Sequence, residues 1–174
     1  MNEKQPDDQP HSASLRSHRR YGQGGCWFVT KCLEPRHPLL VADVAQKISE
    51  TFRWYADHGK IHVAAFVVMP DHWHLMLHTE GHDDVGLFMR KACHWISRET
   101  RNHLREGRAD WQDGFHETCI RTLRQFQFVR CYIENNPVRK KWIDSAHEWQ
   151  WSSAHQKYNG IVPLNWPFQF EEED

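Results

Sequence analysis

The stretch that decides the fold reads IHVAAFVVM at residues 61–69, PD at residues 70–71 and HWHLMLHT at residues 72–79. The first part is almost wholly apolar, which is typical of a strand covered on both faces. Proline and aspartate then interrupt the run, as turn residues do. The last part alternates, because apolar residues at Trp73 and every second position after it are separated mostly by histidines. Two consecutive strands are therefore expected, the second with one face toward the core.

The same kinds of pattern on either side predict two further strands and three helices. Aromatic and β-branched residues indicate strands at residues 26–32 and 115–120. Apolar residues at helical spacing indicate helices at residues 40–58, 85–105 and 122–135. This order is that of a ferredoxin-like α+β fold with one additional C-terminal helix. We expect an antiparallel sheet with helices on one face, which leaves the other face open for a ligand or a partner.

The additional helix has an apolar stripe and a stop signal. The stripe is expected to consist of Leu123, Phe126, Val129 and Ile133. Pro137 is expected to end the helix, because the residue before a proline is disfavoured in the α region.

Length and composition fit a single domain. The chain has 174 residues, of which 39% are hydrophobic and 26% charged, and its mean hydropathy is −0.81. We expect one domain at residues 19–170, between a mobile polar tail at residues 1–18 and an acidic end at residues 171–174. No apolar run approaches the roughly 18 residues of a membrane-spanning helix, and the polar N-terminal stretch lacks a secretory signal. A soluble cytoplasmic protein without membrane contact is expected.

The five cysteines include no C-x-x-C pair. An odd number without that spacing argues against both a disulfide framework and a structural cysteine zinc site. Reduced free thiols are expected.

Charge is segregated along the chain although the net charge is only −1. Residues 86–108 hold six Arg and Lys against two acidic residues, and residues 119–142 hold six against one. Basic segments of this kind suit a polyanion such as nucleic acid. A charge run is nevertheless more often a solvated helix face, so charge alone does not establish a partner.

His72 and His74 form the sharpest local feature. Residues two apart on a strand share a face with their roots roughly 6–7 Å apart, so both imidazoles can converge on one divalent cation. Trp73 between them would point into the core. Because the chain has 14 histidines, such a pair also arises by chance, and the sequence alone leaves both readings open. His78 is expected to be a supporting or surface residue.

Tyr132 and Asn136 form a second feature, because positions four apart on a helix are neighbours on one side. The ordinary alternative is a half-buried tyrosine and a helix-terminal asparagine before a proline. Neither motif is specific in isolation.

Four sequence segments, taken together and in order, are more specific than either motif alone. The segments MPDHWHLMLH, WQDGFHETCIR, RQFQFVRCYIENNPVRKKWI and EWQWSSAHQKY follow one another within residues 19–158. In this order the chain resembles the REP-associated tyrosine transposases, relatives of the single-strand transposases of the HUH superfamily.

The resemblance implies a site and a reaction. The histidine pair that binds Mg²⁺ or Mn²⁺ in the family corresponds to His72 and His74. The family's nucleophilic tyrosine corresponds to Tyr132, and the asparagine that completes its metal site corresponds to Asn136. The implied substrate is single-stranded DNA containing a hairpin, cut to leave a 5′-phosphotyrosine and a free 3′-OH.

The chemistry of these residues agrees with that implication. Free tyrosine titrates near pH 10, so its phenol needs a nearby cation to act as a nucleophile at neutral pH. A divalent ion held by two imidazoles and one amide oxygen keeps open positions for phosphate oxygens. This mixed ligand set does not select Mg²⁺ or Mn²⁺, and the metal's identity rests on the resemblance alone.

Three positions depart from the family pattern. Trp73 is large for the central position of the histidine pair. Asp71 stands where asparagine is frequent, and is expected either to tune His72 or to cap the turn. Lys140 and Lys141 replace a stretch that more usually contains glycine, which leaves the shape of the turn after Pro137 open.

Contacts with DNA are expected from basic residues that could follow phosphates. These are Arg19, Arg20, Arg121, Arg124, Arg139, Lys140 and Lys141. The expected active form is a monomer, with a homodimer as the alternative. Two other functions remain open: a catalytically silent nucleic-acid-binding regulator on the same fold, and a metal-dependent hydrolase that uses water in place of Tyr132.

Overall fold

A computed structural model describes residues 24–34, 42–80, 85–100, 111–162 and 169–170 of the chain. The expected tails at residues 1–18 and 171–174 lie outside these ranges, as do Arg19 and Arg20.

The centre of the molecule is a four-stranded antiparallel sheet. Its strands are β1 (Gly25–Cys32), β2 (His62–Val68), β3 (His72–Thr79) and β4 (His116–Ile120). Their order is β2-β3-β1-β4, and every neighbouring pair is antiparallel. This is the strand order of a ferredoxin-like fold, so the expected fold class is confirmed.

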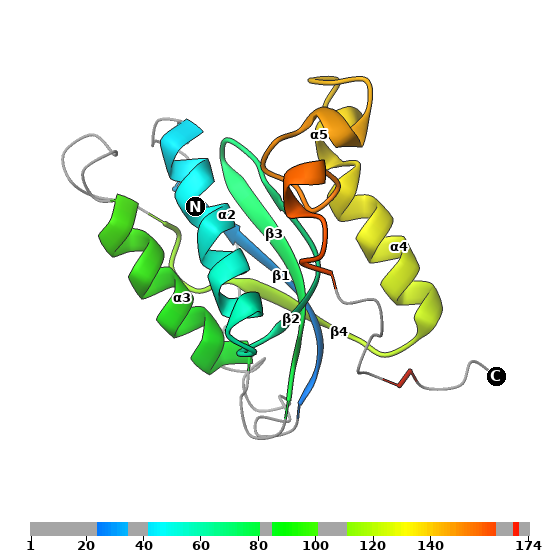
Figure 1. Cartoon of the computed structure of the whole chain (residues 1–174). Coiled ribbons are helices and arrows are strands. Elements are labelled where there is room, and N and C mark those ends of the chain that lie inside the picture. Colours follow the sequence, from blue (N-terminus) through cyan, green and yellow to red (C-terminus); the bar gives the residue numbers. More distant parts are fainter. Residues whose placement is uncertain (1–23, 35–41, 81–84, 101–110, 163–168, 171–174) are drawn as a thin grey trace, which may run out of the picture.

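Two helices cover one face of the sheet, α2 (Ala42–Asp57) and α3 (Val85–Thr100) (Figure 1). They contact each other, and their apolar stripes pack onto the sheet side chains that include Trp73, Leu75 and Leu77. The alternation of β3 is therefore as expected, with its apolar side chains in this main core. The expected continuation of α3 to residue 105 falls outside the described residues.

A third helix, α4 (Leu123–Glu134), lies against the opposite face of the sheet (Figure 1). Phe126 and Ile133 of this helix pack with Met76 and Val67 in a second, smaller core. The face that was expected to be open is therefore partly covered by the helix that carries Tyr132.

The stripe predicted for this helix is wrong at its first position. Leu123 is 50% exposed, whereas Phe126 and Ile133 are buried. Leu123 is the first residue of α4, directly after Thr122, whose side chain caps the helix by accepting a hydrogen bond from the Gln125 N–H. An apolar residue in this first turn is therefore not part of the second core.

The predicted stop at Pro137 is also wrong in detail. Helix α4 ends at Glu134, and after Asn135 the chain re-enters a short helix, α5 (Asn136–Arg139), with Pro137 in its first turn. A proline is tolerated there because the first turn of a helix has no intrahelical acceptor for its N–H. The break comes one residue earlier than expected, and it gives Asn136 a buried place.

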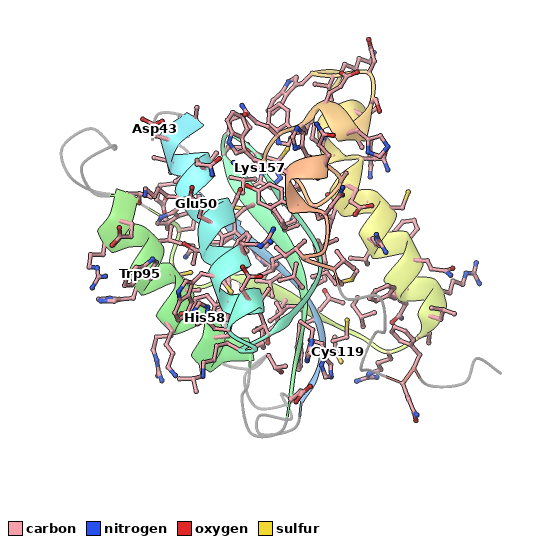
Figure 2. All side chains as sticks on the ribbon, viewed as in Figure 1. Asp43, Glu50, His58, Trp95, Cys119 and Lys157 are labelled. Carbon is pink, nitrogen blue, oxygen red and sulfur yellow. The ribbon has the colours of Figure 1, made fainter. Side chains whose placement is uncertain are left out.

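The segment after α5 closes the edge of the sheet beside β2. It contains two short 3-10 helices, η2 (Ala146–Glu148) and η3 (Gln156–Tyr158). The Val68 N–H donates to the Trp151 carbonyl, and the Ser153 N–H donates to the Phe66 carbonyl. Farther along, the Lys157 ammonium donates to Gln46 of α2 (Figure 2). These bonds fix the C-terminal segment against both the sheet and the helix layer.

No helix among the described residues is long and apolar enough to cross a membrane.

Candidate functional site

The two histidines of the motif lie next to each other at the start of β3, with their ring centroids 4.6 Å apart. Trp73 between them is fully buried on the opposite face of the sheet, against Phe52. The large Trp73 side chain fits because it packs in the main core and does not occupy space beside the two histidines. The alternation of side chains along β3 thus places Trp73 in the core on one face and leaves His72 and His74 together on the other face.

His74 is held in one orientation by its neighbours. Only 5% of its surface is exposed, and its Nδ1 lies 2.8 Å from the Thr30 hydroxyl on β1, its register partner. Burial, with a smaller contribution from the nearby His72, lowers the pKa of His74 from 6.5 to about 3. A neutral imidazole whose Nδ1–H donates to Thr30 keeps its lone pair on Nε2, the form that binds a metal.

His72 is oriented from the other side. Its Nδ1 donates to Asp71 Oδ1 at 2.5 Å, and its side chain is 15% exposed. Because the carboxylate can only accept, the proton sits on Nδ1 and the lone pair on Nε2. A carboxylate behind a ligating histidine is a common supporting arrangement in metal sites, so Asp71 contacts His72 and does not merely cap the turn.

Tyr132 reaches the histidines from α4. Its ring centroid lies 5.5 Å from that of His74, on the same side of the sheet. Phe28 of β1 contacts both rings, with centroid distances of 5.2 Å to His74 and 6.1 Å to Tyr132. Phe28 therefore supplies an apolar wall that sequence analysis did not identify.

Asn136 is the first residue of α5, one turn beyond Tyr132. It is 5% exposed, and its side-chain oxygen Oδ1 is buried without a hydrogen-bond partner. The Nε2 atom of His74 is likewise buried without a partner. A buried polar atom left unpaired costs about 1–3 kcal/mol, which a bound ligand can recover. The two orphaned acceptor atoms and the His72 imidazole are atoms of the types that ligate divalent cations.

The predicted basic residues fall into three groups. Arg121 and Arg124 lie exposed at the start of α4, at the end of the helix far from Tyr132. Arg139 lies over the Tyr132 ring, with its guanidinium carbon 4.8 Å from the centroid, so it contacts the phenol. Lys140 and Lys141 are exposed just beyond.

The turn after Pro137 has a defined shape. The Lys141 N–H donates to the Val138 carbonyl and the Trp142 N–H donates to the Pro137 carbonyl. With φ of 59° at Lys141, this is a Schellman motif with a lysine at the left-handed position, where glycine is the usual residue. The lysine pair therefore keeps the turn that a glycine would favour.

Another set of potential metal ligands lies at the end of β3 remote from His72, beside the start of β2. Among the residues that the structure describes, one group of three His and acidic side chains has its ligand atoms within 4.8 Å of one another, namely His62, His78 and Glu80. His78 is 8% exposed, so of the two expectations for it the surface residue is wrong. The sequence signal was missed because His62 and His78 meet only through the pairing of β2 with β3.

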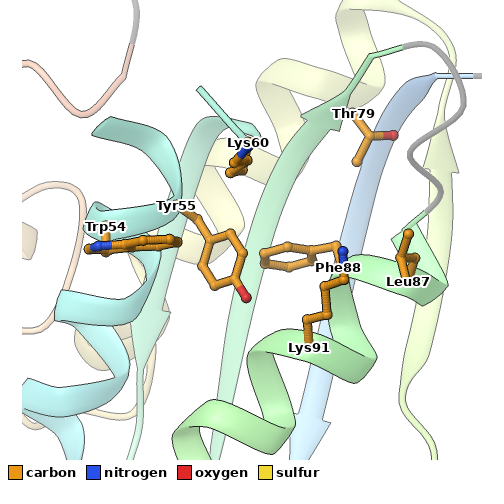
Figure 3. A pocket seen from close by; sticks show the side chains of 7 residues that line it. All are labelled: Trp54, Tyr55, Lys60, Thr79, Leu87, Phe88 and Lys91. Carbon is orange, nitrogen blue, oxygen red and sulfur yellow. The ribbon is translucent and has the colours of Figure 1, made fainter. Parts of the chain in front are cut away.

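A hollow of about 430 Å³ opens on the opposite face of the sheet, between α2, α3 and the end of β3 (Figure 3). The rings of Tyr55 and Phe88 meet edge to face within it, with centroids 5.1 Å apart. Two lysines, Lys60 and Lys91, also line it. It is separated from His74 and Tyr132 by the sheet, and we assign it no part in their site.

Comparison with known proteins gives one family. The family model described as "Transposase IS200 like" matches residues 28–136, from within β1 through β2, β3 and β4 to the whole of α4.

Individual relatives are similar over most of their length. A REP-associated tyrosine transposase of Escherichia coli K12 is 27% identical over 150 residues, which covers 85% of this chain and 88% of that protein. A solved structure of a REP-associated tyrosine transposase bound to a REP hairpin has a TM-score of 0.67 and 25% identity, and the similarity covers 90% of this chain and 93% of that one.

Proposed function

The chain belongs to the family of IS200-like transposases, and from this premise we propose that it cuts single-stranded DNA at a hairpin-forming repeat through a covalent bond to Tyr132. The observation that carries the proposal is the approach of Tyr132 to His74, whose ring centroids are 5.5 Å apart. The buried, unpaired Oδ1 of Asn136, four residues after Tyr132, adds to it. The similarity to a REP-associated tyrosine transposase bound to a REP hairpin supports the choice of substrate.

In the proposed reaction the phenol oxygen of Tyr132 attacks a phosphorus of the DNA backbone. The phenol gives up its proton as the new oxygen–phosphorus bond forms, and the bond from phosphorus to the 3′ oxygen breaks. The departing 3′ oxygen takes up a proton, so no net proton is consumed, and the 5′-phosphate stays on Tyr132. A second attack by a DNA 3′-OH on that phosphotyrosine would release the enzyme and join two DNA ends. The tyrosine serves as a covalent carrier, which divides a difficult exchange into two steps.

His72, His74 and Asn136 are proposed to hold a divalent ion, Mg²⁺ or Mn²⁺. Such an ion would polarise the phosphate and lower the cost of the charge that develops there. The chain's own contribution is orientation: Thr30 and Asp71 each occupy the Nδ1 side of one histidine, so both Nε2 atoms are available. The mixed ligand set leaves the choice between the two metals to experiment.

Arg139 is proposed to act on the phosphate or on the phenol. Its guanidinium lies over the Tyr132 ring, where a positive charge favours both an anionic phenol and a bound phosphate. Lys140 and Lys141 extend this positive region into solvent. Arg121 and Arg124 lie eight or more residues before Tyr132 on α4, roughly 12 Å or more along the helix axis, and are proposed to contact phosphates of the hairpin.

The test uses a labelled single-stranded hairpin oligonucleotide with Mn²⁺, resolved on a denaturing gel. The proposal predicts a slowly migrating covalent adduct with the unaltered protein and none with Tyr132→Phe. Tyr55→Phe is the matched control, because Tyr55 is a half-buried tyrosine on the opposite face of the sheet. Cleavage that survives Tyr132→Phe would favour a hydrolase that uses water, and binding without cleavage would favour a silent regulator.

A further inference from the structure

Three potential metal ligands gather at the end of the β2–β3 pair that is remote from His72. His62 begins β2 and is the register partner of His78 near the end of β3, and Glu80 follows that strand. The His62 Nε2 lies 2.8 Å from Glu80 Oε1, and the two imidazole centroids are 5.9 Å apart. Each of the three side chains offers one ligand atom, and these atoms lie within 4.8 Å of one another.

This group is separate from the site at His74. The two histidines His74 and His78 are on the same face of β3, but the four intervening steps place them roughly 13 Å apart along the strand. One ion cannot bridge that distance, since a zinc–nitrogen bond is about 2.1 Å long. Whatever binds at His62 and His78 is therefore not the ion proposed to lie beside Tyr132.

The arrangement is nearly that of a bound metal. Three ligands of a tetrahedral zinc ion lie about 3.4 Å from one another, given metal–ligand bonds of about 2.0–2.2 Å. The His62 and Glu80 ligand atoms are slightly closer than this, and no two ligand atoms in the group are more than 4.8 Å apart, so side-chain rotations would bring all three onto one ion. An ion would replace the proton that now joins the imidazole to the carboxylate.

The ligand types select the class of metal. Two imidazole nitrogens and one carboxylate oxygen form a set that zinc uses with a water or another group in the fourth position. Imidazole ligands favour zinc and its transition-metal neighbours, whereas Mg²⁺ and Ca²⁺ prefer sites built from oxygen. The oxygen ligand also distinguishes this group from the ligands proposed beside Tyr132, since Glu80 offers a carboxylate and Asn136 a neutral amide.

We propose that His62, His78 and Glu80 form a zinc-binding site that joins the start of β2 to the end of β3. His78 is buried in the sheet, whereas the side chains of His62 and Glu80 are 32% and 69% exposed, so the site is open to solvent on one side. A metal bound there would stabilise the folded chain, because it binds the paired strands and not the separated ones.

The test titrates Zn²⁺ into the full chain carrying His72→Ala and His74→Ala, which removes the other histidine pair. Co²⁺ serves as a second probe, since its visible absorption reports ligand number and geometry. The proposal predicts one equivalent of Zn²⁺, a rise in Tm on binding, and at least a 10-fold loss of affinity with either His62→Ala or Glu80→Gln. Both altered residues are partly exposed, so these variants are expected to fold, which circular dichroism checks.

The matched control is His58→Ala, because His58 is an exposed histidine at the end of α2, outside the group. It is expected to leave Zn²⁺ affinity unchanged. The proposal is overturned if the chain lacking His72 and His74 binds no Zn²⁺, or if neither His62→Ala nor Glu80→Gln weakens binding. The assay measures no DNA cleavage, so its result is independent of the function proposed for Tyr132.

Discussion

His74 and Tyr132 lie on the same side of the sheet with their ring centroids 5.5 Å apart, although a helix and a strand separate β3 from α4 in the chain. The approach depends on packing, because Phe126 and Ile133 fix α4 against Met76 and Val67. Tyr132 is thereby directed at the histidine pair by the same helix face that forms the second core.

Asn136 is expected to contribute to metal binding and not to the stability of the metal-free fold. In metal-free buffer, Asn136→Leu removes a buried oxygen that has no hydrogen-bond partner, so the free energy of unfolding should stay the same or rise by about 1 kcal/mol. The same variant should lose the rise in Tm that Mn²⁺ produces and should form at least 100-fold less covalent adduct. Thermal unfolding with and without Mn²⁺ measures the stability and the Tm effect, and the denaturing gel measures the adduct.

Asn135→Ala is the control for that experiment. Its amide donates to the Cys131 carbonyl within α4. We expect Asn135→Ala to lose some stability and to keep the Mn²⁺ effect. A large loss of stability in metal-free Asn136→Leu, with the Mn²⁺ effect intact, would contradict the role given to Asn136.

Thr30 is expected to act through His74. Thr30→Val removes the hydroxyl that lies 2.8 Å from His74 Nδ1, and the imidazole then loses its fixed orientation. Loss of such a supporting hydrogen bond lowers metal affinity by about 10–100-fold in known sites. Calorimetric titration with Mn²⁺ should show that loss in Thr30→Val and near-normal affinity in Thr30→Ser, which keeps the hydroxyl. Equal affinities in both variants would remove Thr30 from the site.

The sequence predicted those parts of the structure that depend on local pattern. The strands at residues 61–69 and 72–79 and the exit of Trp73 to the core follow from a period of two residues. The neighbouring positions of His72 and His74 could be predicted because both belong to one short strand motif.

Contacts that depend on strand pairing were not predicted. Thr30 meets His74, and His62 meets His78, only because β3 lies between β1 and β2 in a given register. The exposure of Leu123 could not be read from helical spacing either, since it depends on how far α4 extends beyond the sheet. The helical turn after Asn135 was missed because a proline both ends one helix and fits the first turn of the next.

Cys26 makes stability depend on pH in the alkaline range. Its thiol is fully buried in the second core, and burial raises its pKa from 9.0 to about 12, with Cys119 adding to the rise. Because the unfolded chain ionises first, the contribution of this thiol to stability is complete below pH 9 and is lost as pH rises from about 9 toward 12.

The free energy of unfolding is expected to fall by at most about 1.4 kcal/mol per pH unit between pH 9 and pH 12 through this thiol. Urea unfolding at a series of alkaline pH values measures it. Cys26→Ala should show a shallower decline above pH 9 than the unaltered chain. If the free energy of unfolding falls equally with pH in both proteins, this thiol does not cause the loss of stability.

Lys141 holds a backbone conformation that suits glycine. A left-handed conformation costs a residue with a side chain about 1–2 kcal/mol, and glycine in turn costs about 0.5–1 kcal/mol in chain entropy. Lys141→Gly should therefore raise the free energy of unfolding by about 0.5–1 kcal/mol as the difference of these terms. Lys140→Gly is the control. Lys140 has an ordinary φ of −81°, so glycine at this position should lower the free energy of unfolding. Chemical denaturation of both variants distinguishes the two signs.

The central claim is that the phenol of Tyr132 becomes bonded to DNA. Trypsin cuts after Arg130 and Arg139, and the peptide of residues 131–139 contains Tyr132 as its sole tyrosine. After reaction with a hairpin oligonucleotide and Mn²⁺, followed by nuclease and trypsin digestion, mass spectrometry should find the 5′-phosphate or nucleotide on Tyr132 of this peptide. A nucleotide attached to another residue, or cleaved DNA with this peptide unmodified throughout the reaction, would contradict the account.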